Sequence, residues 1–80
     1  MKAKIYVTLK NGVLDPQGKV ILSSLPGLGI AGVEDVRVGK YFDVVLKDIG
    51  AEEARRLLDD ACRRLIANTV IEDYRIEIER

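Results

Sequence analysis

The stretch KAKIYVTLKNGVLDPQGKVI, residues 2–21, holds the signals for a strand, a turn and the beginning of a helix. Ile5, Val7 and Leu9 alternate with polar residues, which is the period of a strand that has one face on a hydrophobic core. Asn11 and Gly12 follow and are typical of a turn. The stretch therefore predicts a first strand that ends before residue 11.

Asp15 and Pro16 predict the first residues of a helix. A carboxylate at the N-cap accepts backbone N–H bonds, and proline at the first helical position loses no donor that the helix would use. Gly18 is unfavourable in a helix and indicates either close backbone packing or contact with a partner. The glycine spacing does not match GxGxxG, and Val20 occupies the position where a GxxxxGK[ST] loop needs Ser or Thr. A capped helix is therefore favoured over a phosphate site, because a carboxylate at the cap also repels an anion.

Four apolar residues of this helix have helical spacing, and we expect them to face the sheet. They are Val20, Ile21, Leu25 and Leu28. Pro26 and the glycines around it predict the end of the helix, because proline clashes with the preceding turn and glycine permits left-handed geometry.

The middle segment GVEDVRVGKYFDVVLKD, residues 32–48, has its apolar residues at even positions on both sides of Gly39. This pattern favours one long strand that bends at Gly39. A hairpin with a two-residue turn at Gly39 and Lys40 would bring Asp43 onto the apolar face. A three-residue loop with a bulge would instead pair Val38 with Phe42, so a hairpin stays open as an alternative.

The segment GAEEARRLLDDACRRLIAN, residues 50–68, predicts a second helix that Asn68 ends in the left-handed conformation. The expected buried stripe consists of Ala54, Leu57, Leu58, Ala61, Cys62 and Leu65. The other face is ionic, with acid-before-base pairs at i,i+4. These expected pairs are Glu52–Arg56, Asp59–Arg63 and Asp60–Arg64. Finally, Tyr74, Ile76 and Ile78 alternate with charged residues and predict a terminal strand.

The predicted order is βαβαβ, or βαββαβ if the middle segment folds back. Such a single α+β domain over residues 1–80 is related to the ferredoxin-like sandwich, with two helices on one face of a mainly antiparallel sheet. The second face of the sheet stays open and suits another sheet, which predicts a homodimer or a tetramer built from dimers. The residues expected on that face are Tyr6, Thr8, Arg37, Tyr41 and Val45.

Composition argues against several classes of function. Thirteen Lys and Arg residues balance thirteen Asp and Glu residues, so the chain has no positive field for nucleic acid. It has no His, and its one Cys, Cys62, lies on the expected buried stripe, where a thiol is usually inert. We therefore expect no catalytic, cofactor or metal site. No apolar run is long enough to span a membrane, and we expect a cytoplasmic protein.

Three segments in register resemble the PurS family, the small subunits of phosphoribosylformylglycinamidine (FGAM) synthase. They are LKNGVLDPQG at residues 9–18, VRVGKYFDVVL at 36–46 and CRRLIANTVIEDYRIEI at 62–78. The resemblance implies a role in purine biosynthesis, where formylglycinamide ribonucleotide, glutamine and ATP yield FGAM. It implies an accessory dimer that bridges the large subunit PurL and the glutaminase PurQ and supports ammonia transfer. ATP, Mg and glutamine would be used by the complex and not bound by this subunit.

The recognisable loops supply the candidate contacts with partners, and we expect Arg37 and Lys40 to lead them because neither has an evident structural need. The full set is Asp15, Pro16, Gly18, Arg37, Gly39, Lys40, Asn68, Ile71, Glu72 and Tyr74. Several of these have an alternative explanation in capping, bending or core packing, and core packing is the alternative explanation for Ile71. A ferredoxin-like domain that senses a small molecule or binds RNA is the alternative function.

Overall fold

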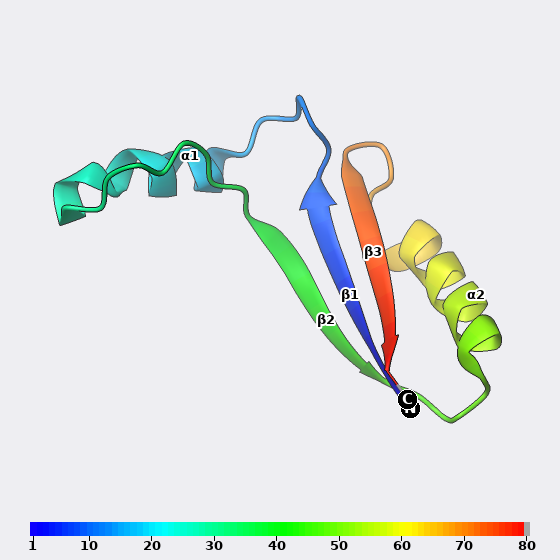
Figure 1. Cartoon of the computed structure of the whole chain (residues 1–80). Coiled ribbons are helices and arrows are strands. Elements are labelled where there is room, and N and C mark those ends of the chain that lie inside the picture. The colour runs from blue at the N-terminus through cyan, green and yellow to red at the C-terminus, as the bar shows by residue number, and fades with distance from the viewer. Residues whose placement is uncertain (80) are drawn as a thin grey trace.

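The computed structural model describes residues 1–79 and consists of a three-stranded antiparallel sheet with helices in both connections (Figure 1). The strand order is β2-β1-β3. The elements are β1 (Lys2–Leu9), α1 (Pro16–Ser24), the 3-10 turn η1 (Pro26–Leu28), β2 (Gly39–Val45), α2 (Ala51–Ala61), the π-helical turn η2 (Cys62–Ile66) and β3 (Glu72–Glu79). The α+β class is confirmed.

The core lies between the central strand β1 and α2. Ala3, Ile5 and Val7 alternate inward and are essentially inaccessible to solvent. Three residues of the second helix at i,i+4 spacing cover them, namely Ala54, Leu58 and Cys62. The expected stripe was too wide, because Leu57 is 44% and Leu65 is 85% exposed. A helix of this length on a three-stranded sheet buries one narrow row of side chains.

The first helix does not cover the sheet. Together with η1 it extends away from the end of β1 and β2, and residues 30–38 return beside it (Figure 1). We call residues 16–38 the arm. The expectation that its apolar residues face the sheet was wrong, since Val20 is 64%, Ile21 43% and Leu28 74% exposed. Helical spacing identifies an apolar face but not the surface that covers it.

The middle segment does not fold back, so the hairpin alternative was wrong. Regular pairing begins only at Gly39, whereas residues 33–38 run along the arm and form no strand. The predicted long strand is therefore shorter than expected. Its register confirms the predicted face, because Phe42 lies opposite Ile5 and Val44 opposite Ala3.

The second helix ends differently from the prediction. Within residues 1–79 only glycines have positive φ, so Asn68 is not in the left-handed conformation. Instead the chain becomes extended at Ala67, and the Asn68 carbonyl accepts bonds from the amides of Ile71 at 3.0 Å and Glu72 at 2.7 Å. Asn68 thus closes the turn into β3.

The two ends of the described chain lie together at the end of the sheet opposite the arm (Figure 1). Lys2 pairs with Glu79 in the β1–β3 ladder. The N-terminal ammonium donates to the Leu46 carbonyl oxygen at 2.9 Å. The arm is therefore the part of the chain most distant from both ends.

Candidate interaction surface

Asp15 forms the centre of the junction between the sheet and the arm, which we call the elbow. The residue is 5% exposed, and its carboxylate accepts bonds from the amide of Gly18 at 2.9 Å and of Val38 at 2.7 Å. These N–H bonds, Val38 first, lower the pKa of Asp15, with a further contribution from the positive charge of Arg37. The predicted cap is confirmed, and the same carboxylate also ties the returning segment to the helix.

Arg37 holds the other side of the elbow. Its guanidinium donates to the carbonyl oxygens of Leu9 at 3.3 Å, Lys10 at 3.1 Å and Val13 at 3.4 Å. Its Nε lies 4.0 Å from the Asp15 carboxylate. The expectation that Arg37 lacks a structural need was therefore wrong. The sequence does not reveal this role, because the carbonyl acceptors lie at the end of β1 and in the following loop, more than twenty residues earlier.

Glycine at positions 18 and 39 is required by close backbone contacts. A Cβ at Gly18 would lie well under 3.0 Å from the Val36 carbonyl oxygen of the returning segment. A Cβ at Gly39 would lie 2.5 Å from the Val7 carbonyl oxygen of β1. Of the two explanations for Gly18, close packing within the chain is the one that the structure supports.

A small cavity of about 240 Å³ opens at the elbow. Its lining includes five of the predicted contact residues, which are Asp15, Pro16, Gly39, Lys40 and Glu72. Lys40 is exposed beside Gly39 at the start of β2. Folding thus brings together predicted residues from three separate regions of the sequence.

The turn before β3 lies at the same end of the sheet. The amide of Lys10 donates to the Ile71 carbonyl at 2.9 Å, which ties this turn to the end of β1. Core packing does not explain Ile71, since the residue is 39% exposed, and its neighbour Val70 is 80% exposed. The turn therefore places exposed apolar side chains beside the elbow, and the sequence alone did not indicate this.

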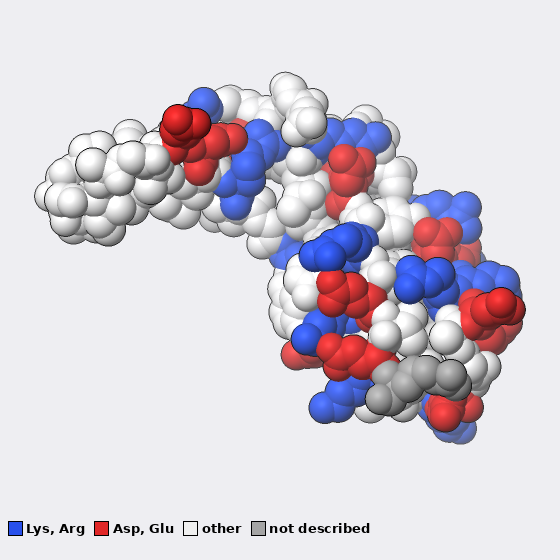
Figure 2. Space-filling model, viewed as in Figure 1, with Lys and Arg blue, Asp and Glu red and all other residues white. Residues whose placement is uncertain are grey.

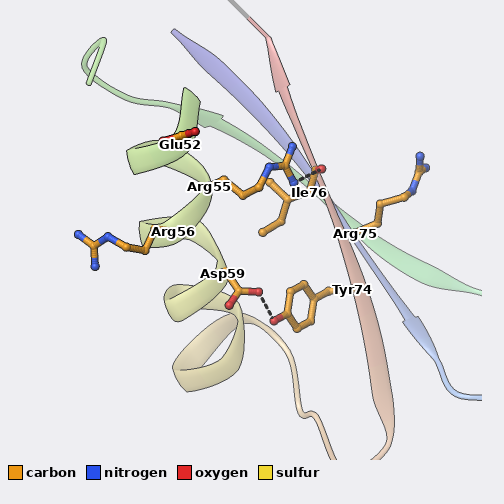
Figure 3. Close-up of a pocket in the computed structure, with 7 residues that line it drawn as sticks. All are labelled: Glu52, Arg55, Arg56, Asp59, Tyr74, Arg75 and Ile76. Atoms are coloured by element: carbon orange, nitrogen blue, oxygen red, sulfur yellow. Dashed lines mark hydrogen bonds between the residues drawn. The ribbon is translucent and has the colours of Figure 1, made fainter. Parts of the chain in front are cut away.

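Tyr74 lies apart from the elbow, in a groove between α2 and β3 (Figure 3). Its hydroxyl donates to the Asp59 carboxylate at 2.5 Å, and this bond raises the pKa of Tyr74. Arg55 donates to the Ile76 carbonyl at 3.2 Å and so covers the outer edge of β3. The groove has a volume of about 600 Å³, and the polar groups of Tyr74 and Arg55 in its lining are bonded within the chain.

The ionic face of α2 is confirmed in two of its three pairs. Asp59 pairs with Arg63 at 3.0 Å and Asp60 with Arg64 at 3.2 Å. The predicted Glu52–Arg56 pair was wrong, because Arg56 binds Glu53 instead. Both acids lie within reach in the first turn, and spacing alone does not decide between them.

The open face of the sheet carries an aromatic pair surrounded by paired charges. The rings of Tyr6 and Tyr41 lie 5.3 Å apart, and the guanidinium of Arg75 lies 4.4 Å above the Tyr6 ring. Tyr41 donates to the Asp43 carboxylate at 2.7 Å, which raises the pKa of Tyr41 to about 12. Lys4 pairs with Glu79 at 2.9 Å. Arg37 was expected here and lies at the elbow instead.

Three features of the described residues bear on metal binding, thiol chemistry and membrane spanning. Across residues 1–79, no three side chains of His, Cys, Asp or Glu converge as metal ligands. Cys62 is fully buried, and burial raises the pKa of its thiol, so the reactive thiolate is disfavoured. None of the helices in this range is long and apolar enough to cross a membrane.

Comparison with known proteins identifies the family. The family model PurS, described as phosphoribosylformylglycinamidine (FGAM) synthase, matches residues 2–80. The chain belongs to the PurS family. Among curated PurS subunits, that of Bacillus subtilis is 44% identical over 98% of this chain and 92% of its own length. That of Synechocystis is 48% identical over 94% of this chain and 75% of its own length.

Solved PurS structures share the whole fold, arm included. PurS of Methanocaldococcus jannaschii matches with a TM-score of 0.90 at 35% identity, covering 99% of this chain and 95% of that chain. A chain in the structure of PurLQS from Thermotoga maritima matches with a TM-score of 0.87 at 29% identity, covering 95% and 93%. The extended arm therefore belongs to the PurS architecture.

Proposed function

We propose that this chain is the small accessory subunit of FGAM synthase and joins the large subunit PurL and the glutaminase PurQ in one complex. Membership of the PurS family supports the subunit assignment, and the PurLQS assembly of Thermotoga maritima supports association with the other subunits. The M. jannaschii relative is described as one of the subunits of formylglycinamide ribonucleotide amidotransferase in the purine biosynthetic pathway.

The chemistry of the complex explains why a subunit of this kind is useful. Formylglycinamide ribonucleotide, glutamine and ATP become FGAM, glutamate, ADP and phosphate. Ammonia released at the glutaminase must reach the amide carbon before it escapes to water, so the two larger subunits must be held in a fixed arrangement. In this proposal PurL and PurQ bind ATP, Mg and glutamine, and the small subunit works as a cytoplasmic homodimer that holds them together.

The observation that carries the proposal is the combination of a rigid elbow with exposed side chains around it. Asp15 and Arg37 fix the backbone there, so the exposed groups need little ordering on binding. Lys40 is the leading contact residue, because it is exposed at the rim of the cavity while Arg37 is used within the chain. Glu72 and Pro16 line the same cavity.

Reconstitution tests the proposal. PurL and PurQ from the same organism are assayed for FGAM formation with and without this chain, using glutamine or an ammonium salt as nitrogen donor. We expect glutamine-dependent activity to require the chain, whereas ammonium bypasses the need for transfer between subunits. Equal glutamine-dependent activity without the chain, together with no co-migrating complex, would contradict the proposal.

A charge reversal locates the contact. Lys40→Glu is expected to weaken co-migration with the larger subunits while leaving the thermal stability of the chain unchanged. Lys47→Glu is the matched control, because Lys47 is also exposed but follows β2 at the other end of the sheet. Equal effects of the two substitutions would remove the elbow from the interface.

A further inference from the structure

The turn at Asn11 and Gly12 is a feature of the chain that the proposed function does not use. It lies in the connection between β1 and α1, and both residues are exposed. The Val13 amide donates to the Lys10 carbonyl oxygen at 3.1 Å and closes the turn. The connection passes beyond the end of the sheet (Figure 1), and Figure 2 shows an uncharged projection at this place. The asparagine side chain is therefore open to water.

An asparagine that precedes glycine can lose its side-chain amide without an enzyme. The backbone nitrogen of the following residue attacks Cγ and closes a succinimide ring, while the bond from Cγ to the side-chain nitrogen breaks and ammonia leaves with the backbone proton. Water then opens the ring at either carbonyl. One opening gives aspartate. The other gives isoaspartate, in which the main chain runs through Cγ and gains a methylene group.

The chain has two asparagines, and Asn11 is the one that meets the conditions for this reaction. Gly12 has no side chain to block the attack, and nothing lies within 4 Å of where a Cβ would stand. Its amide donates to no backbone carbonyl within residues 1–79. Asn68 instead precedes the branched Thr69, and its side-chain oxygen accepts a bond from the Val70 amide at 3.2 Å. An exposed turn with few hydrogen bonds also opens at low cost, which lets the reacting atoms meet.

The reaction would alter the elbow, because the carbonyl groups on both sides of Asn11 and Gly12 hold Arg37. The guanidinium donates to the carbonyl oxygens of Lys10 at 3.1 Å and Val13 at 3.4 Å. A methylene group inserted between these carbonyls changes their spacing, so one guanidinium no longer fits both. The new carboxylate is also a stronger acceptor for Arg37 than a neutral carbonyl.

We infer that Asn11 is a site of spontaneous deamidation, and that its isoaspartate product releases Arg37 from the turn and loosens the elbow. The inference concerns the covalent chemistry of this chain and does not depend on the proposed function. The chain thus acquires, as it ages, a chemical mark at the junction between the sheet and the arm.

Peptide mapping of the full-length chain tests the site. The folded protein is kept at mildly alkaline pH and digested with trypsin, and an unincubated sample corrects for reaction during digestion. The peptide of residues 11–19 should gain the mass of an amide-to-acid exchange, with fragment ions assigning it to Asn11 and not to Gln17. This peptide should also accept a methyl group from S-adenosylmethionine through an isoaspartyl methyltransferase.

The peptide of residues 65–75 is the matched internal control, because it contains Asn68 and should stay unchanged. No conversion of the 11–19 peptide beyond the unincubated sample, or equal conversion of both peptides, would overturn the inference.

Urea titration of aged protein tests the effect on the elbow. Loss of the Arg37 bonds should raise the ratio of unfolded to folded chain about 5–30-fold. Asn11→Ser, aged identically, should keep its original stability, because serine also suits a turn but has no amide to lose. In Arg37→Ala, conversion should add little, since the bonds at stake are already absent. A converted chain as stable as the fresh one, or an equal loss in wild type and Arg37→Ala, would contradict the effect on the elbow. Neither measurement involves PurL or PurQ, so its outcome is separate from that of the reconstitution.

Discussion

Replacing Gly18 with alanine reverses the usual effect of this substitution in a helix. In an ordinary helix interior, alanine is about 1 kcal/mol more favourable than glycine. At position 18 the added methyl group would lie well under 3.0 Å from the Val36 carbonyl oxygen and 3.1 Å from Cγ of Asp15. The first neighbour is backbone, so the returning segment must move and cannot simply change a rotamer.

The magnitude follows from these opposing effects. Overpacking of this kind costs about 1–3 kcal/mol. Movement at Val36 also weakens the nearby bond from the Val38 amide to Asp15, at a further cost of about 1 kcal/mol. Alanine's higher helix propensity offsets about 1 kcal/mol of these two costs, so Gly18→Ala should lower the unfolding free energy by about 2 kcal/mol. For a domain of this size, Tm should fall by roughly 8–16 °C.

Thermal unfolding followed by far-UV circular dichroism measures this effect. The protein concentration must be the same for all variants, because association raises the apparent stability. Gly27→Ala is the matched control, since its φ is not positive and no atom lies within 4 Å of an added Cβ. We expect its Tm to be unchanged or slightly higher. A Gly18→Ala variant that melts at or above the wild-type temperature would refute the packing argument.

Three further predictions concern the elbow and the open face. Arg37→Ala should lower the unfolding free energy by about 1–2 kcal/mol through loss of its carbonyl bonds, whereas Lys47→Ala should have no effect in the same urea titration. The pKa of Asp15 is below its ordinary 3.8, so the stability that its carboxylate contributes is present above that pH and is lost as the pH falls through the lowered value. The difference in unfolding free energy between wild type and Asp15→Asn should therefore shrink in acid. A constant difference from pH 7 to pH 2 would contradict this. In a spectrophotometric titration, Tyr41→Phe should remove the phenol with a pKa of about 12, and Asp43→Asn should lower that pKa.

Local signals in the sequence predicted local structure well. The cap at Asp15 depends on residues within three positions, and the alternation in each strand depends on neighbours two positions apart, so both are visible without tertiary information. The family resemblance then identified the subunit type. These predictions needed no knowledge of how the elements are arranged.

Most of the predictions that failed depended on distant contacts, whereas the Glu52–Arg56 pair failed for a local reason. Val20 and Ile21 have the spacing of a buried face, but both are exposed. Arg37 looked free because its acceptors lie at the end of β1 and in the loop that follows. Ile71 is apolar and yet exposed in a turn. The spacing of apolar residues identifies one face of a helix or strand. Whether that face is buried depends on which other elements pack against it.

The pairing of Lys2 with Glu79 makes this protein suitable for circular permutation. Opposite residues in an antiparallel ladder have Cα atoms about 5 Å apart, so a short linker could join the two ends without disturbing the sheet. New ends could then be opened at Gly29, at the tip of the arm, where the chain turns with φ 78°. Such a permutant would keep the sheet and α2 while separating α1 from its returning segment. Substitutions in the arm could then be made and studied separately from substitutions in the sheet.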